Sequence, residues 1–145
     1  GVGEPWFDGI EPALARGLMA IPGARAVEFS SGTSASVMRG SDHNDAWLPG
    51  DSDPVPEGAD SAQADGALGG RSTSAPISAR VHFKPPSSLP REQFTLHLPS
   101  DEIRSLKVGG RHDPVIGPRA APVVEAVAML VIADLGMTGG YIGID

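Results

Sequence analysis

Apolar residues spaced four apart predict a first helix over residues 8–20. Ile10, Leu14 and Leu18 fall on one stripe, which is the pattern of a helix that buries one face. Asp8 stands where its side chain would cap the first turn, and a glutamate follows three residues later in capping-box spacing. A proline and a glycine directly after the helix are expected to end it.

Residues 24–29 alternate and predict a strand, with Val27 and Phe29 on the face opposite Ala24. A Ser-Gly turn follows, so residues 34–39 are expected to form the antiparallel partner of this strand.

A stricter alternation marks a strand over residues 75–84. Two prolines end it, because proline donates no hydrogen bond to a ladder. Another strand is expected over residues 94–98, and residues 106–118 are expected to be irregular. The apolar members of the strict alternation are Ile77, Ala79, Val81 and Phe83.

The longest apolar run, from Ala120 to Leu135, predicts a helix that begins at Pro118 or Pro122. A proline and two acidic residues interrupt the run, so we expect a buried helix that is too short and too polar to span a bilayer. Strands and helices in mixed order favour an α+β or layered α/β arrangement.

Residues 46–65 show no periodicity and are rich in proline, glycine and aspartate. This composition predicts a flexible acidic loop, with an ordered lid as the alternative. The 145-residue length is sufficient for one domain with one core.

The formal net charge is −7, from 11 basic and 18 acidic residues. Such a chain has no broad attraction for nucleic acid or anionic lipid, so an anionic ligand requires a local basic pocket. The absence of cysteine excludes disulfides, thiolate catalysis and cysteine-ligated zinc. It also agrees with the reducing, cytoplasmic location that we expect.

Three segments carry candidate chemistry. Residues 66–74 combine glycines with hydroxyl side chains, which suits either an anion-binding loop or a plain turn. Residues 84–89 place a lysine, two prolines and two serines at a strand end, which suits a phosphate or simply terminates the strand. Residues 109–114 hold Arg111, His112 and Asp113 behind two glycines, as a ligand-binding turn or an ion-paired surface turn.

The four histidines lie at positions 43, 82, 97 and 112. None forms a close pair at helical ligand spacing, so no metal site is expected. Residues 43–45, His-Asn-Asp, are interpreted as a turn of hydrogen-bonding side chains rather than as a ligand wall.

Seven segments together resemble the chorismate synthase family, in the family's order. Residues 1–8 resemble its Gly-x-Gly-x-Pro-x-Phe-Asp entry to a helix, and residues 20–28 resemble the helix exit and strand that follow. Residues 40–45 are similar to its Gly-Ser-x-x-x-Asp turn. The series is completed by residues 69–70, 83–85, 111–120 and 125–126.

The resemblance implies the carboxy-terminal portion of such an enzyme, and an α+β fold that is part of a layered β-α-β-α sandwich. It implies an FMN-dependent lyase of the shikimate pathway, which converts 5-enolpyruvylshikimate 3-phosphate to chorismate and phosphate by 1,4-anti elimination. Reduced FMN would be the cofactor, with NADPH a candidate electron source for flavin reduction. The full-length enzyme would be a homotetramer.

The resemblance also assigns site residues by position. Pro22 and Gly23 match a pair whose backbone lines the FMN, and Gly69 matches a glycine that contacts it. Asp113 matches an aspartate near the flavin and is the expected proton-handling catalytic residue. Arg111 matches an arginine close to flavin and substrate, and the family's Lys-Pro-x-Ser/Thr-Ser/Thr loop is matched by Lys84, Pro85, Pro86, Ser87 and Ser88. We expect Gly69, Lys84 and Asp113 to converge on one pocket.

This sequence departs from the family pattern in two ways. The family's Gly-x-Ser-His-Gly motif, its second catalytic histidine and its arginine cluster do not occur, so the isolated chain is expected to be inactive. Asp65, Arg71 and Ser74 stand where the family pattern has other residues around its glycine loop. These changes leave open a second interpretation, a non-catalytic flavin-binding or oligomerisation module derived from the same fold.

Overall fold

The computed structural model describes residues 1–50, 55–56, 65–73 and 75–143. These described residues form two longer helices, three short helical segments and four two-stranded antiparallel ribbons. The helical segments are η1 (Trp6–Asp8), α1 (Ile10–Met19), η2 (Gly32–Val37), α2 (Gly40–His43) and α3 (Gly117–Thr138), where η denotes a 3-10 helix. The strands are β1 (Ala24–Phe29), β2 (Trp47–Leu48), β3 (Val55–Pro56), β4 (Ala67–Leu68), β5 (Arg71–Ser72), β6 (Ala79–Phe83), β7 (Glu92–His97) and β8 (Glu102–Lys107). The mixture confirms the α+β prediction.

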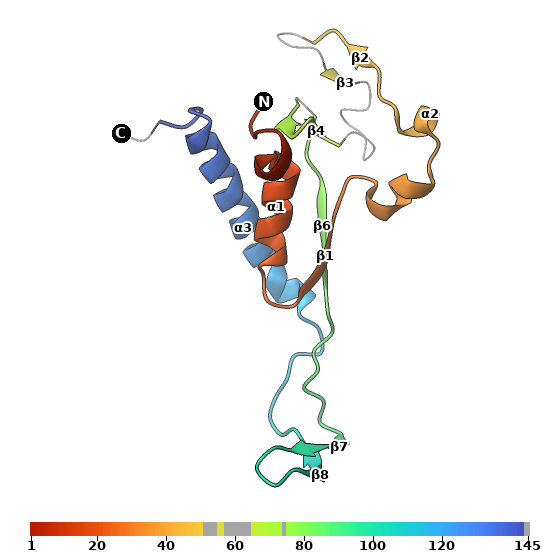
Figure 1. Ribbon diagram of the computed structural model, residues 1–145, viewed down its shortest axis with the longest axis vertical. Helices are drawn as coiled ribbons and strands as arrows, with labels where there is room; N and C mark the ends of the chain where they lie inside the picture. The colour runs from red at the N-terminus through yellow and green to blue at the C-terminus, as the bar shows by residue number, and fades with distance from the viewer. Residues whose placement is uncertain (51–54, 57–64, 74, 144–145) are drawn as a thin grey trace.

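The core lies where α1 packs between α3 and the ribbon of β1 and β6 (Figure 1). The stripe predicted for the first helix is buried, and Leu18 is its most enclosed member, with 1% of its surface exposed. Side chains from α3 and from the ribbon pack around this stripe. They include Val27, Phe29, Ile77, Val81, Phe83, Val124, Val127, Ala128, Val131 and Leu135.

Helix α1 begins at a different cap from the one predicted. Gly9 is the N-cap, and no side chain caps the helix. The Ile10 backbone N–H instead donates to the Gly70 carbonyl at 2.8 Å. The Asp8 cap was therefore wrong, because a carbonyl from a distant glycine turn satisfies one of the first-turn donors.

The ribbon pairs β1 with β6, so the prediction that residues 34–39 pair with β1 was wrong. Those residues lie largely in η2. A bulge between Ala24 and Ala26 shifts the register of β1, so that Val27 and Phe29 reach the core together with Ala24. The predicted alternation overlooked this extra residue, which rotates side chains to the other face.

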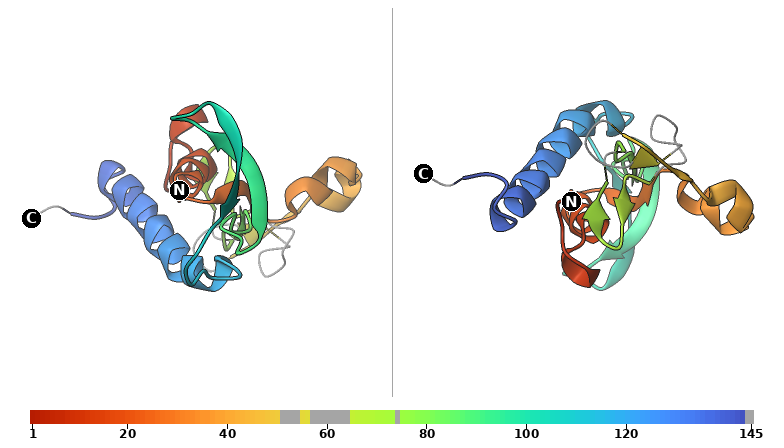
Figure 2. Two further views of the ribbon diagram at one scale, coloured as in Figure 1. Left: turned by 90° about the horizontal axis from the view of Figure 1, so that it is seen from below. Right: turned by 90° about the horizontal axis from the view of Figure 1, so that it is seen from above.

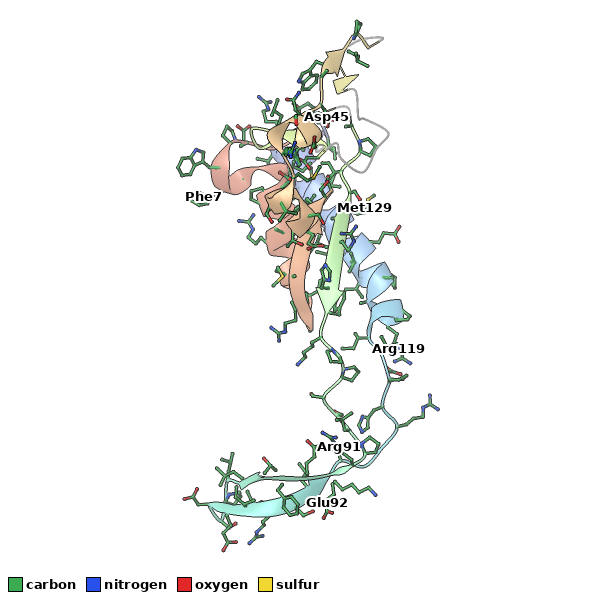
Figure 3. The ribbon with its side chains drawn as sticks, turned by 90° about the vertical axis from the view of Figure 1, so that its right-hand side faces the viewer. Phe7, Asp45, Arg91, Glu92, Arg119 and Met129 are labelled. Carbon is green, nitrogen blue, oxygen red and sulfur yellow. The ribbon has the colours of Figure 1, made fainter. Side chains whose placement is uncertain are left out.

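We call the packed unit of α1, α3 and the ribbon of β1 and β6 the body. Two extended segments, residues 84–91 and 108–116, lead from it to a separate hairpin of β7 and β8 (Figures 1 and 3). Strand β7 is close to the predicted residues 94–98. Strand β8 was missed, and its last two residues fall in a stretch that was expected to be irregular.

Helix α3 is longer and less buried than predicted. It spans 22 residues, and only Ala120 and Gly136 are fully buried. By length and composition alone it could cross a membrane, because an 18-residue stretch within it has a mean hydropathy of 1.8, so the expectation that it is too short and too polar was wrong. One face packs on α1, while Val123, Met129, Leu130 and Ile132 are exposed on the rest of its surface.

The amino-terminal end of α1 lies beside the small ribbon of β4 and β5, and the ribbon of β2 and β3 lies farther out, at the top of Figure 1. Seen along the long axis, α2 projects away on the side opposite α3 (Figure 2). Within the predicted loop of residues 46–65, β2 and β3 pair, and residues 51–54 and 57–64 lie outside the described residues, as does Ser74.

Candidate functional site

A cleft of about 440 Å³ lies at the end of the ribbon from which the two extended segments leave. One wall is the end of β6 with Lys84, Pro85 and Pro86, and the other is formed by residues 114–117 before α3. Two segments singled out for candidate chemistry therefore meet, although about 30 residues separate them. The volume lies in the range of small-molecule sites, about 300–1,000 Å³.

Gly23 adjoins the same walls. Its φ is +91°, a conformation that favours glycine. The Lys84 backbone N–H donates to the Gly23 carbonyl at 2.9 Å. A Cβ at Gly23 would lie 3.7 Å from both Phe83 and Ile116, so this turn is fixed against the cleft.

The cleft has apolar walls and one lining cation, Lys84, while Ser87, Ser88 and Arg111 lie further along the two segments that form its walls. Lys84, Ser87, Ser88 and Arg111 are all exposed. Among the described residues, neither Lys84 nor Arg111 has an ion pair. Prolines and aliphatic side chains suit a planar ring, and free cations suit a phosphate, so the donor set fits FMN.

Asp113 does not line the cleft but stands next to Pro114, which does. Arg119 Nη1 lies 2.9 Å from Asp113 Oδ2, with the two side chains 73% and 49% exposed. Arg119 belongs to the first turn of α3, and Figure 3 shows it at the lower end of that helix. The Asp113 carboxylate therefore has an ion-pair partner from α3 next to the cleft wall.

The tandem glycines lie at the opposite end of α1, a helix about 15 Å long. Gly70 is tightly packed, because a Cβ there would lie 2.5 Å from the Glu4 carbonyl oxygen, whereas Gly69 faces open space. Gly69 does not line the cleft that Lys84 lines. The expected convergence of Gly69 with Lys84 and Asp113 is thus not found within this chain.

The glycine loop instead borders a second cavity, of about 270 Å³, together with residues 43–45. His43 Nε2 lies 3.9 Å from Asp65 Oδ2 across it. Burial raises the pKa of Glu11 nearby, and the charge of Asp65 adds to this effect. A turn of hydrogen-bonding side chains was preferred for residues 43–45, but in the structure these residues form a wall of this cavity.

Glu28 forms a cluster on the ribbon face that points away from the helices. Arg80 Nη1 donates to its Oε2 at 3.1 Å, and His82 Nε2 lies 3.1 Å from the same oxygen. Thr33 donates to its other oxygen at 3.0 Å. The hydrogen bond with His82, followed by those with Thr33 and Arg80, lowers the pKa of Glu28 to about 2. This cluster could not be predicted from the sequence, since its members are up to 54 residues apart.

Comparison with known proteins decides the family. Residues 1–137 match the family model of chorismate synthase. The chain belongs to the chorismate synthase family. Chorismate synthase of Aeropyrum pernix is 47% identical over 93% of this chain, and that of Methanopyrus kandleri is 44% identical over 100% of it.

The chain spans about a third of the length of these curated chorismate synthases, 35% and 36% respectively. A crystal structure of chorismate synthase matches with a TM-score of 0.71 and 23% sequence identity. That match covers 96% of this chain and 34% of the other. The fold of this chain is therefore one part of a larger chorismate synthase fold.

Proposed function

We propose that this chain supplies the flavin-binding part of a chorismate synthase. The reaction is the 1,4-anti elimination of phosphate from 5-enolpyruvylshikimate 3-phosphate, which gives chorismate. Family membership supports the reaction, and one observation supports the role of this chain. The cleft between Lys84–Pro86 and residues 114–117 joins a cation that has no ion pair among the described residues to apolar walls beside the Gly23 turn.

Reduced FMN, when bound, would supply electron density to the allylic system as phosphate leaves. The residues of this chain would bind and orient it. Lys84 would act as a point charge for a phosphate, and Ser87 and Ser88 would donate hydrogen bonds. Pro22 and Gly23 would present backbone to the ring, and Arg111 would attract an anionic group at the cleft edge.

Asp113 is the residue of this chain that would handle a proton. Its side chain is 49% exposed. Arg119 holds that carboxylate from the first turn of α3 and so acts as a positioning residue rather than a catalytic one. A proton acceptor works best when its direction is fixed in advance, and the ion pair supplies this.

The remaining parts of the site would come from protein outside these residues. Curated relatives are about three times as long as the matched segment. The exposed residues of α3 agree with a helix that other layers cover, because a helix apolar on all sides is normally enclosed. The isolated chain would then bind flavin weakly and would not turn over substrate.

Flavin titration tests the binding role. Lys84→Ala should weaken FMN binding by about ten-fold while leaving the unfolding midpoint unchanged, because an exposed lysine contributes little to folding. Lys107→Ala is the matched control, since Lys107 is the only other lysine and lies on the distant hairpin. Equal FMN affinities for the two variants would refute the assignment of Lys84.

A reconstituted enzyme tests the catalytic role. We expect chorismate formation when the chain is combined with the amino-terminal part of a family member. Asp113→Asn should abolish turnover at unchanged FMN affinity. Arg119→Ala should lower kcat with little change in KM, and Arg119→Lys should restore part of it. Turnover by the 145-residue chain alone, or flavin binding without restored turnover, would contradict the proposal, and the second result would favour a non-catalytic module.

A further inference from the structure

A third cavity, of about 180 Å³, lies where the amino-terminal segment meets the end of α3. Hydrogen bonds join the two segments there, because the Tyr141 hydroxyl donates to the Gly1 carbonyl at 3.1 Å. Arg71 Nε donates to the same carbonyl at 3.2 Å. Both segments lie at the upper end of the body in Figure 1, whereas the cleft lined by Lys84 lies at the other end of α1. We call this third space the helix-end cavity.

Glycines keep the helix-end cavity open. Gly3 and Gly139 both line it. A Cβ at Gly3 would lie 2.4 Å from the Gly70 carbonyl oxygen, and a Cβ at Gly139 would lie 2.8 Å from the Tyr141 ring. Neither position accepts a side chain without displacing its neighbours, so the walls keep their shape. The volume lies below the range of about 300–1,000 Å³ that drug-sized ligands occupy, so the cavity suits a smaller molecule.

Charged side chains of both signs line the helix-end cavity. The positive charges belong to Arg16 and Arg71, and the negative ones belong to Glu4, Asp8 and Asp134. Among the described residues, none of the five forms an ion pair. All five are exposed, so a ligand can reach them from solvent. A purely anionic ligand would face three carboxylates and a purely cationic one would face two guanidinium groups, so complementarity favours a molecule that carries both charges.

The end of α3 favours the cationic half of such a molecule. The last carbonyl groups give the carboxy-terminal end of a helix a partial negative charge, which a basic side chain normally complements. No basic residue lies in the last turn of α3. Asp134, four residues before the helix ends, instead adds a negative charge. An ammonium group in the cavity would complement both the helix end and this carboxylate.

Arg71 suits the anionic half. Its Nε is bonded to the Gly1 carbonyl, which holds the guanidinium at the cavity, and its two Nη groups make no hydrogen bond among the described residues. A guanidinium group can bind a carboxylate through two parallel N–H bonds. Arg71 is also a position at which this sequence departs from the family pattern, so this half of the site is a property of this chain.

We propose that the helix-end cavity binds an aliphatic α-amino acid. Its carboxylate lies on Arg71, and its ammonium group lies at Asp134 and the end of α3. Leu135 and Tyr141 also line the cavity and provide apolar contacts for the side chain. The site is separate from the cleft lined by Lys84, so it stands or falls independently of flavin binding.

Titration of the 145-residue chain with L-leucine, followed by calorimetry or NMR, tests the site. Two analogues of the same shape are the controls. 4-Methylpentanoate lacks the ammonium group, and 3-methylbutan-1-amine lacks the carboxylate. Leucine should bind at least about ten-fold more tightly than either analogue, because only leucine engages both charged halves. Undetectable leucine binding, or equal binding of all three probes, overturns the proposal.

Arg71→Ile tests the carboxylate half. It should weaken leucine binding by about ten-fold or more, and Arg71→Lys should retain part of the affinity because it keeps the charge. Arg91→Ile, at the base of the distant hairpin (Figure 3), is the matched control and should change the affinity less than about two-fold. Equal leucine affinities of Arg71→Ile and Arg91→Ile contradict the assignment of Arg71.

Asp134→Asn tests the ammonium half. It should weaken leucine binding by about ten-fold or more without lowering the unfolding midpoint, because it removes an unfavourable charge near a helix end. Glu125→Gln, an exposed acid earlier in α3, is the matched control and should change the affinity less than about two-fold. Full leucine affinity in Asp134→Asn overturns the proposed orientation of the ligand.

Discussion

Two of the four antiparallel ribbons among the described residues are nearly equal in length but lie in very different surroundings. The ribbon of β1 and β6 lies under α1 and α3, while β7 and β8 have no helix on either side. Both are antiparallel ladders, and they differ only by the bulge in β1, so strand pairing alone does not account for the difference. The difference shows that burial of one face, rather than pairing of strands, determines where the stability of this chain lies.

The test with the largest expected effect on stability removes a buried side chain from the body. Leu18→Ala should lower the free energy of unfolding by about 3–5 kcal/mol, because Leu18 is the most enclosed core residue and leaves a cavity. Phe94→Ala, on the uncovered ribbon, should change it by less than about 0.5 kcal/mol in the monomer. Urea unfolding at low protein concentration measures both changes. Similar losses of unfolding free energy would mean that the hairpin of β7 and β8 is part of the core.

The next test compares Gly70, which is tightly packed, with its neighbour Gly69, which faces open space. Gly70→Ala should destabilise the chain by about 2–4 kcal/mol, since its φ is +89° and a Cβ would meet the Glu4 carbonyl. Gly69→Ala should cost only about 1–2 kcal/mol, because its φ is +61° but the space around it is open. Thermal or urea unfolding checks the ranking, and a larger loss for Gly69→Ala would contradict the assignment of Gly70 to packing.

The smallest effect is expected on the solvent face of the covered ribbon. Because the folded pKa of Glu28 is about 2 and its ordinary value is 4.5, Glu28 stabilises the fold above pH 4.5. That contribution is lost as the pH falls through about 2. Glu28→Gln should therefore be less stable than the wild-type chain at pH 7, with a difference that shrinks between pH 4.5 and pH 2.

Unfolding midpoints measured across that pH range check the behaviour of Glu28. Glu102→Gln, in strand β8 of the uncovered hairpin, is the matched control. It removes an exposed pair with Arg104 within one strand, so it should leave the midpoint unchanged at pH 7. A constant difference for Glu28→Gln at every pH would rule out the ionised carboxylate as its cause.

The predictable parts of this fold are those with a strict period. The stripe of Ile10, Leu14 and Leu18 and the alternation around Val81 led directly to α1 and β6. Strand β8 was missed because its two apolar residues, Ile103 and Leu106, are three apart and do not alternate. Its identity depends on pairing with β7, which local pattern does not encode.

The candidate site was predictable in a similarly uneven way. The segments around Lys84 and Asp113 do meet at one cleft, next to Gly23. Gly69 does not join them, because the turn that it shares with Gly70 is fixed at the other end of α1 by the bond from Ile10. The pairing of Arg119 with Asp113 was not predicted, since it depends on how the first turn of α3 faces the preceding segment.

The hairpin of β7 and β8, with its two connecting segments, leaves one wall of the cleft and returns to the other. This part of the chain therefore forms a long loop whose two ends lie close together at the cleft. Closing such a loop becomes only slowly more costly as it lengthens, by about 0.6 kcal/mol per doubling. Evolution, or a protein engineer, can thus lengthen, shorten or replace residues 92–107 while the cleft walls keep their places.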